Sequence, residues 1–196
     1  MQIARPLTLA DAALPHARAH SNTLLVVLAS LLTAAAAQIS VHLPWTPVPL
    51  TGQTFAVLLS GAVLGARRGC LAQALYVLAG ATGMPFFAGG AGGIAALVGP
   101  TGGYLLAFPV AAYVTGRLAE RGWDRRPPTM FAAMLLGSTA IFAAGLAQLA
   151  RFVPDGSLLA AGLLPFIPGD LVKSALAAGV FPQIWRLAKR AEPPSR

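Results

Sequence analysis

The sequence has few charged side chains. Of its 196 residues, 14 are basic and 6 are acidic, whereas 56% of the chain is hydrophobic. An ordinary soluble domain carries roughly 25% charged residues, and this chain has too few to cover the surface of a soluble domain of its length. We therefore expect an integral membrane protein made of one domain with several membrane-spanning helices.

Cysteine and histidine are also scarce. The single cysteine, Cys70, excludes a disulfide framework and a multi-cysteine metal site. The histidines, at positions 16, 20 and 42, are too scattered for metal ligands, so we expect no metal. The sequence offers no paired carboxylates, no nucleophile with a base and no ATP-binding motif. We expect neither catalysis nor transport driven by the chain's own ATP hydrolysis, and no signal peptide in the first 22 residues.

Long uncharged stretches locate six helices. Residues 19–66 and 69–116 contain no formal charge over 48 positions each, and 127–150 add 24 more. Because a span needs about 20 residues, the first two stretches hold two spans each and the third holds one. A last apolar stretch completes the set. The expected spans are 22–42, 53–66, 68–83, 101–120, 129–151 and 165–186.

We therefore expect an all-α membrane protein whose six-helix domain covers 22–190, with tails over 1–21 and 191–196. Three prolines within 44–49 cannot lie inside a helix. A Gly-rich loop over 84–103 separates the third helix from the fourth. Glycine allows a close backbone approach, so this loop is interpreted either as a cover for a ligand or as a place of close helix packing.

Basic residues indicate the orientation. With the N-terminus in the cytoplasm, 12 of the 14 lysines and arginines fall on the cytoplasmic side. Arg151 falls on the other side, and Lys173 lies within a span. This asymmetry follows the positive-inside rule and predicts both termini inside. The net charge of +8 is then explained by topology, so we expect a lipid membrane rather than nucleic acid as the partner.

Asp170 and Lys173 are the charged residues of the last span. Each costs at least ~2.5–3.5 kcal/mol at the centre of a bilayer unless it is paired or faces a cavity. Three positions apart, they share one helix face. One interpretation is an ion pair with Asp170 capping the helix. The other is a polar ligand site that offers an acceptor and a donor to one small molecule.

Two further features have more than one interpretation. Gln53 follows a Pro-rich segment at the start of the second span, where its amide suits either a neutral ligand group or solvation of a helix end. In the first span, Ala29, Thr33 and Ala37 form a small-residue stripe at spacing four. Such a stripe favours close contact with another helix, inside or outside this chain.

Six motifs in collinear order over about residues 25–190 resemble the BioY family, the biotin-binding substrate-capture (S) components of energy-coupling factor (ECF) transporters. The motifs are Pro49-Leu50-Thr51-Gly52-Gln53-Thr54, Leu64-Gly65-Ala66-Arg67-Arg68-Gly69, Gly83-Met84-Pro85, Phe87-Ala88-Gly89-Gly90, Gly99-Pro100-Thr101-Gly102-Gly103-Tyr104 and Pro168-Gly169-Asp170-Leu171-Val172-Lys173.

The resemblance implies biotin uptake across the inner membrane of a bacterium, with biotin as the transported ligand and no cofactor. It implies that a transmembrane coupling (T) component and paired ABC-type ATPases are the partners, reached through Ala29, Thr33 and Ala37 of the first helix. It also implies a biotin site near the extracellular side. The residues that match the family's positions there are Asp170, Lys173, Gln53, Tyr76, Phe87 and Tyr104.

The chemistry of biotin agrees with these residues. Its ureido ring has two N–H donors and a carbonyl acceptor, which match a carboxylate beside an ammonium group, although the ligand carboxylate is an alternative partner for Lys173. We expect Phe86, Phe87 and Trp45 to contact its apolar parts. Two other classes stay open: a self-sufficient facilitator, which needs repeats or a continuous polar path, and a non-transporting membrane assembly protein.

Overall fold

The computed structural model describes residues 8–14 and 19–191. Helices dominate this part of the chain, with one short antiparallel pair of strands, in which Ser40 lies opposite Thr51 and Val41 opposite Leu50. In chain order the elements are α1 (Leu9–Ala13), α2 (Ala19–Gln38), β1 (Ser40–Val41), β2 (Leu50–Thr51), α3 (Gln53–Leu64), α4 (Ala66–Ala81), η1 (Ala88–Gly90), α5 (Ile94–Val98), α6 (Gly102–Glu120), η2 (Trp123–Arg125), α7 (Pro127–Leu149), α8 (Leu158–Gly162) and α9 (Ile167–Ala191).

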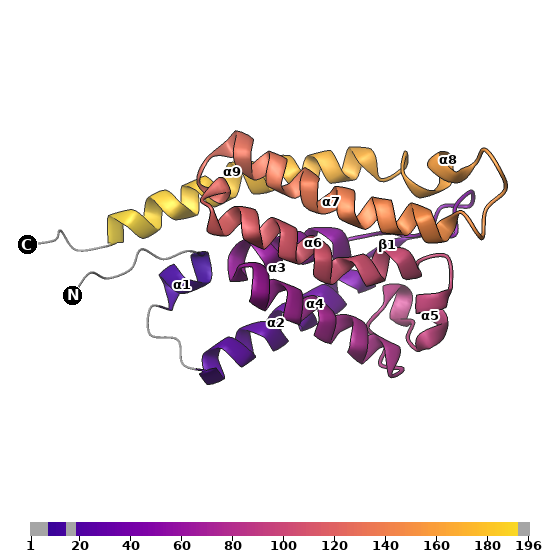
Figure 1. Ribbon diagram of the computed structural model, residues 1–196, viewed down its shortest axis with the longest axis horizontal. Helices are drawn as coiled ribbons and strands as arrows, with labels where there is room; N and C mark the ends of the chain where they lie inside the picture. Colours follow the sequence, from indigo (N-terminus) through magenta and orange to yellow (C-terminus); the bar gives the residue numbers. More distant parts are fainter. Residues whose placement is uncertain (1–7, 15–18, 192–196) are drawn as a thin grey trace, which may run out of the picture.

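The long helices run roughly side by side (Figure 1). Helix α6 lies at the centre and packs against α3, α4 and α7, while α2 covers α4 and α9 covers α7. One end of the bundle carries α1, η2 and the last turns of α9. The opposite end carries the strand pair, α5 and α8. Connections that are far apart in sequence therefore meet at each end.

The six longest helices lie close to the six expected ranges, and their bounds differ by a few residues. Two of them, His20–Gln38 and Pro127–Leu149, are long and apolar enough to cross a membrane. Helix α3 has 12 residues and rises about 18 Å at 1.5 Å per residue. The segment expected as an N-terminal tail, 1–21, contains α1 and the start of α2. Of the tail expected over 191–196, residue 191 ends α9 and the others lie outside the described residues.

The turn between α3 and α4 is a single residue, Gly65. Its φ of 87° is a left-handed conformation that side-chain-bearing residues rarely adopt. A Cβ at this position would lie 2.8 Å from Oε1 of Glu120. The same oxygen accepts a hydrogen bond from the backbone N–H of Ala66 at 2.8 Å. A carboxylate from α6 thus caps the first turn of α4, where the positive end of the helix dipole favours it.

Arg68 joins α1 to this turn. Its guanidinium forms an ion pair with Asp11 at 2.7 Å and donates to the side chains of Thr8 at 3.1 Å and Asn22 at 3.0 Å. Its Nε donates to the carbonyl of Leu64 at 2.7 Å. One side chain therefore connects the start of α1, the first turn of α2 and the end of α3.

Asp124 makes a comparable connection between η2 and α9. Its side chain is fully buried and accepts a hydrogen bond from Nε1 of Trp185. The guanidinium of Arg125 lies 4.5 Å from the centre of the same indole ring. Burial raises the pKa of Asp124 from 3.8 to about 6, against the opposing effects of Trp185 and Arg125. The folded protein therefore holds this proton more tightly than the unfolded chain does.

This difference predicts a pH-dependent stability. The raised pKa favours the folded state fully below about pH 3.8 and loses its effect as the pH rises through about 6, with an amplitude on the order of 2–3 kcal/mol. We expect the melting temperature, followed by circular dichroism, to fall between pH 5 and pH 7.5. Asp124→Asn should flatten this dependence, and Asp155→Asn, at an exposed loop position, should not. An unchanged profile in Asp124→Asn would contradict the assignment.

Candidate ligand-binding site

A cavity of about 410 Å³ lies at the end of the bundle that carries the strand pair. The segment from Ile39 to the start of α3 forms one wall, and α6, α7, the turn before α9 and α9 itself supply the rest. Most of the lining is apolar, and the polar groups come from the β2–α3 junction and from α9. The lining residues are Ile39, Val41, Val48, Pro49, Leu50, Thr51, Gly52, Thr54, Tyr104, Phe108, Phe142, Phe166, Gly169, Asp170 and Lys173.

Asp170 lies in the first turn of α9, and its backbone N–H donates to the carbonyl of Phe166 at 2.9 Å. It is therefore inside the helix and does not cap it. Its Oδ1 accepts a hydrogen bond from the hydroxyl of Ser138 at 2.7 Å. Both side chains are buried. This bond across α7 and α9 fixes the carboxylate at the edge of the cavity.

Lys173 lies one turn further along α9 and crosses to the other wall. Its ammonium group donates to the carbonyl of Thr51 at 2.9 Å and to the hydroxyl of Thr54 at 3.1 Å. These partners belong to β2 and to the first turn of α3. Lys173 thus holds the segment that closes one side of the cavity against the last helix.

Asp170 and Lys173 form no ion pair with each other in the described part of the chain. Asp170 accepts its hydrogen bond from Ser138 of α7, whereas Lys173 donates its hydrogen bonds to β2 and α3. The interpretation of a self-contained ion pair does not hold for this structure, because each charged group is oriented by partners on another element. The carboxylate of Asp170, an acceptor, and the ammonium group of Lys173, a donor, instead line the same cavity. This arrangement is the one that a polar ligand site needs.

The apolar wall differs from the expected one. Phe108, Phe142 and Phe166 line the cavity, and the ring of Tyr104 joins them while its hydroxyl donates to the carbonyl of Gly162 at 2.8 Å. The expected Trp45 is 64% exposed and does not line the cavity, nor do Phe86 and Phe87.

Gln53, Tyr76 and Phe87 form a buried cluster outside the cavity lining. Nε2 of Gln53 donates to the hydroxyl of Tyr76 at 2.8 Å, and this hydroxyl donates to the carbonyl of Phe86 at 3.1 Å. The ring of Tyr76 also meets that of Phe87 edge to face, with centroids 5.6 Å apart. The cluster joins the first turn of α3 to α4 and to the Gly-rich segment. It therefore supports the part of the cavity wall that the start of α3 forms, without lining the cavity itself.

The Gly-rich segment packs on the bundle instead of covering this cavity. None of residues 84–103 belongs to its lining. Gln38 of α2 donates to the carbonyls of Pro85 and Phe87, both at 3.4 Å. Gln148 of α7 donates to the carbonyls of Leu97 at 2.9 Å and Gly99 at 2.7 Å. The interpretation as close packing therefore fits the structure better than that of a ligand cover.

The small-residue stripe of α2 faces inward. Thr33 and Ala37 are fully buried, and Ala29 is half-buried. The hydroxyl of Thr33 accepts a hydrogen bond from Gln73 of α4 at 3.1 Å and donates to the carbonyl of Ala29 at the same distance. In this conformation the expected contact through Thr33 and Ala37 is closed to another protein, because α4 and its neighbours already occupy that face.

The sequence pattern did not reveal Ser138, Thr51 or Thr54 as partners of the charged pair. A serine inside an apolar span commonly bonds its own helix, so its role was not evident. The weak signal that existed was Gly137-Ser138-Thr139, a short polar interruption in a 24-residue uncharged stretch.

Comparison with known proteins gives consistent results. The BioY family model matches residues 10–190. The probable biotin transporter BioY of Pyrococcus horikoshii is 46% identical over 153 residues, which cover 78% of this chain and 89% of that protein. The biotin transporters BioY of Rhizobium etli and Thermotoga maritima are 36% and 43% identical, over 79% and 70% of this chain and 87% and 81% of their own lengths.

The fold has a counterpart among solved structures. The crystal structure of the S-component for biotin from an ECF-type ABC transporter superposes with a TM-score of 0.74, at 21% identity, over 85% of this chain and 92% of that chain. The relatives named above are transporters, so the chain is a membrane protein and not an enzyme. With a family model that matches nearly its whole length, the chain belongs to the BioY family.

Proposed function

We propose that this chain binds biotin in the cavity between the β1–α3 segment and helices α6, α7 and α9. The observation that carries the proposal is the pairing of one carboxylate and one ammonium group with an otherwise apolar cavity. The ureido ring of biotin offers donors to Asp170 and an acceptor to Lys173, and the aromatic wall suits its thioether ring. The family and the names of the relatives support the same ligand.

The proposed role is biotin uptake across the cytoplasmic membrane. The six longest helices would form the membrane domain with both chain ends inside, which places the cavity towards the outer surface. Six of the described exposed or half-buried arginines lie at the opposite end, in the first turn of α4, at the end of α6 and around η2, as the positive-inside rule requires. They are Arg67, Arg68, Arg117, Arg121, Arg125 and Arg126.

The energy for uptake would come from partners. The sequence has no ATP-binding motif, and the solved structure that shares its fold is the S-component of an ECF-type ABC transporter. A T component and ABC-type ATPases are therefore the proposed partners. Of the three stripe residues, Ala29 alone reaches the surface, so the contact would form around Ala29 and the exposed side of α2.

The first test is titration calorimetry of biotin with the detergent-purified chain. We expect one-to-one binding, weakened at least about tenfold in Asp170→Asn and in Lys173→Ala, because each change removes hydrogen bonds to a charged group. Ser138→Ala should weaken binding less, since it only loosens the carboxylate. Asp155→Asn, at an exposed position outside the cavity, serves as control. Absence of binding by the folded protein would refute the proposal.

A second prediction concerns the cluster behind the cavity. Tyr76→Phe removes the hydroxyl that accepts from Gln53 and donates to Phe86, which should lower the free energy of unfolding by about 1 kcal/mol. Because Tyr76 does not line the cavity, biotin affinity should fall by less than in Asp170→Asn. Calorimetry beside a thermal melt separates the two effects. Loss of binding with unchanged stability would mean that Tyr76 contacts the ligand directly.

A third prediction concerns the partners. The chain, coexpressed with a T component and ATPases, should copurify with them, whereas a facilitator needs no such complex. Ala29→Trp should abolish copurification and leave biotin binding of the isolated chain unchanged. Val180→Trp, on the exposed side of α9, is the matched control. Biotin uptake at the wild-type rate in cells lacking the ATPases would count against the proposed mechanism.

A further inference from the structure

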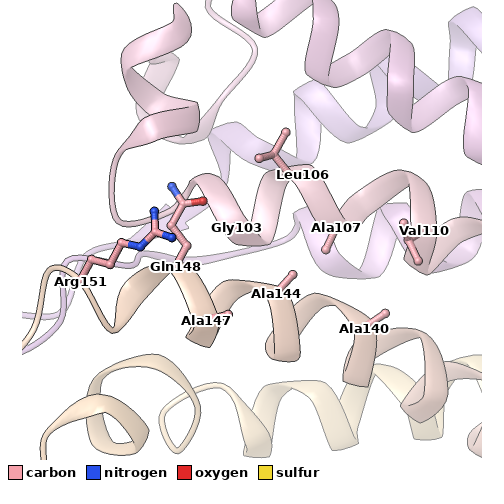
Figure 2. Close-up of a pocket in the computed structure, with 9 residues that line it drawn as sticks. All are labelled: Gly103, Leu106, Ala107, Val110, Ala140, Ala144, Ala147, Gln148 and Arg151. Carbon is pink, nitrogen blue, oxygen red and sulfur yellow. The ribbon is translucent and has the colours of Figure 1, made fainter.

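A groove lies on the flank of the bundle between α6 and α7 (Figure 2). It encloses about 410 Å³ and is separate from the cavity described above. The two helices touch beneath it, since a Cβ added to Gly103 would lie 2.3 Å from the carbonyl oxygen of Ala144. The lining residues are Gly103, Leu106, Ala107, Val110, Ala140, Ala144, Ala147, Gln148 and Arg151.

The groove is apolar along most of its length and opens to the side of the bundle. Leu106 and Val110 are 52% and 55% exposed, and small side chains leave the space between the helices empty. From Ala140 to Leu149, α7 rises about 14 Å, close to half of the ~30 Å hydrocarbon thickness of a bilayer. In the membrane placement proposed above, a groove of this length along α7 faces the acyl chains of one leaflet.

A cationic side chain stands at the end of the groove nearest the strand pair and α8. Figure 2 shows Arg151 there, extended towards Gln148, with Val110 and Ala140 at the opposite end. Arg151 is exposed, and its backbone N–H donates to the carbonyl of Gln148 at 3.2 Å. Its guanidinium forms no ion pair or hydrogen bond within residues 8–14 and 19–191. The amide nitrogen of Gln148 donates to the carbonyls of Leu97 and Gly99, and as a donor it does not pair with the guanidinium. The guanidinium is therefore an uncompensated charge, and the membrane placement proposed above puts it near the level of the lipid phosphates.

We propose that this groove binds an anionic phospholipid, with the phosphate at Arg151 and one acyl chain between α6 and α7. A planar guanidinium matches the geometry of a phosphate group, and the apolar groove matches the chain attached to it. The inference rests on the membrane placement proposed above and is independent of biotin binding.

Native mass spectrometry of the purified full-length chain, titrated with phosphatidylglycerol or phosphatidylcholine, tests the proposal. We expect one tightly retained phosphatidylglycerol and weaker retention of phosphatidylcholine. Arg151→Gln should lower the affinity for phosphatidylglycerol about fivefold, and Ala144→Leu, which fills the groove, should lower it at least as much. The matched controls are Ala143→Leu, exposed on the same helix outside the groove, and Arg121→Gln, exposed at the other end of α6.

Thermal melting checks that each variant is folded, so the test holds whether or not the chain binds biotin. Loss of lipid in both groove variants and not in the controls supports the site. Equal retention by all variants overturns it, and so does a loss common to the controls. A dimer of this chain that Ala144→Leu dissociates, without any retained lipid, would show that a second copy occupies the groove and would also overturn the proposal.

Discussion

The cavity depends on the two hydrogen bonds that the Lys173 ammonium group donates across it. They join α9 to Thr51 and Thr54, at the junction of β2 and α3, which lie more than a hundred positions earlier in the chain. An ammonium group inside a membrane protein is costly unless it has such partners. Because a movement of either element would take these partners from the ammonium group, the two hydrogen bonds hold α9 and the β1–α3 segment in position. Ser138 does the same for the carboxylate one turn away.

The cluster behind this segment completes the arrangement. Gln53 begins α3 and donates to Tyr76 of α4, whose hydroxyl donates to the backbone of the Gly-rich segment. Two side chains thus hold the first turn of α3: Lys173 bonds to Thr54, and Tyr76 bonds to Gln53. Rearrangement of the cavity wall therefore involves the Gly-rich segment as well, although that segment contributes no lining residue.

The sequence predicted the long helices well, because charge is expensive inside a bilayer and uncharged stretches therefore mark their ranges. It marked Asp170 and Lys173 as residues that need partners or a polar space for the same reason, and the structure places both in the lining of the cavity. The directions of the side chains were not predictable. Tyr76 and Phe87 point into a cluster and Trp45 points outward, which depends on contacts between distant segments. Similarly, the stripe at Thr33 packs on α4 because Gln73 offers a buried donor.

The hydrogen bonds of Arg68 separate two adjacent arginines that look equivalent in the sequence. Arg67 is exposed, so any long basic side chain at its position supplies the same charge. Arg68 directs its guanidinium at acceptors on three sides, a geometry that the three donors of a lysine on a flexible stem do not reproduce. Its charge is also balanced by Asp11. Position 67 is therefore open to exchange for lysine during evolution, whereas position 68 is restricted to arginine for as long as α1 stays docked.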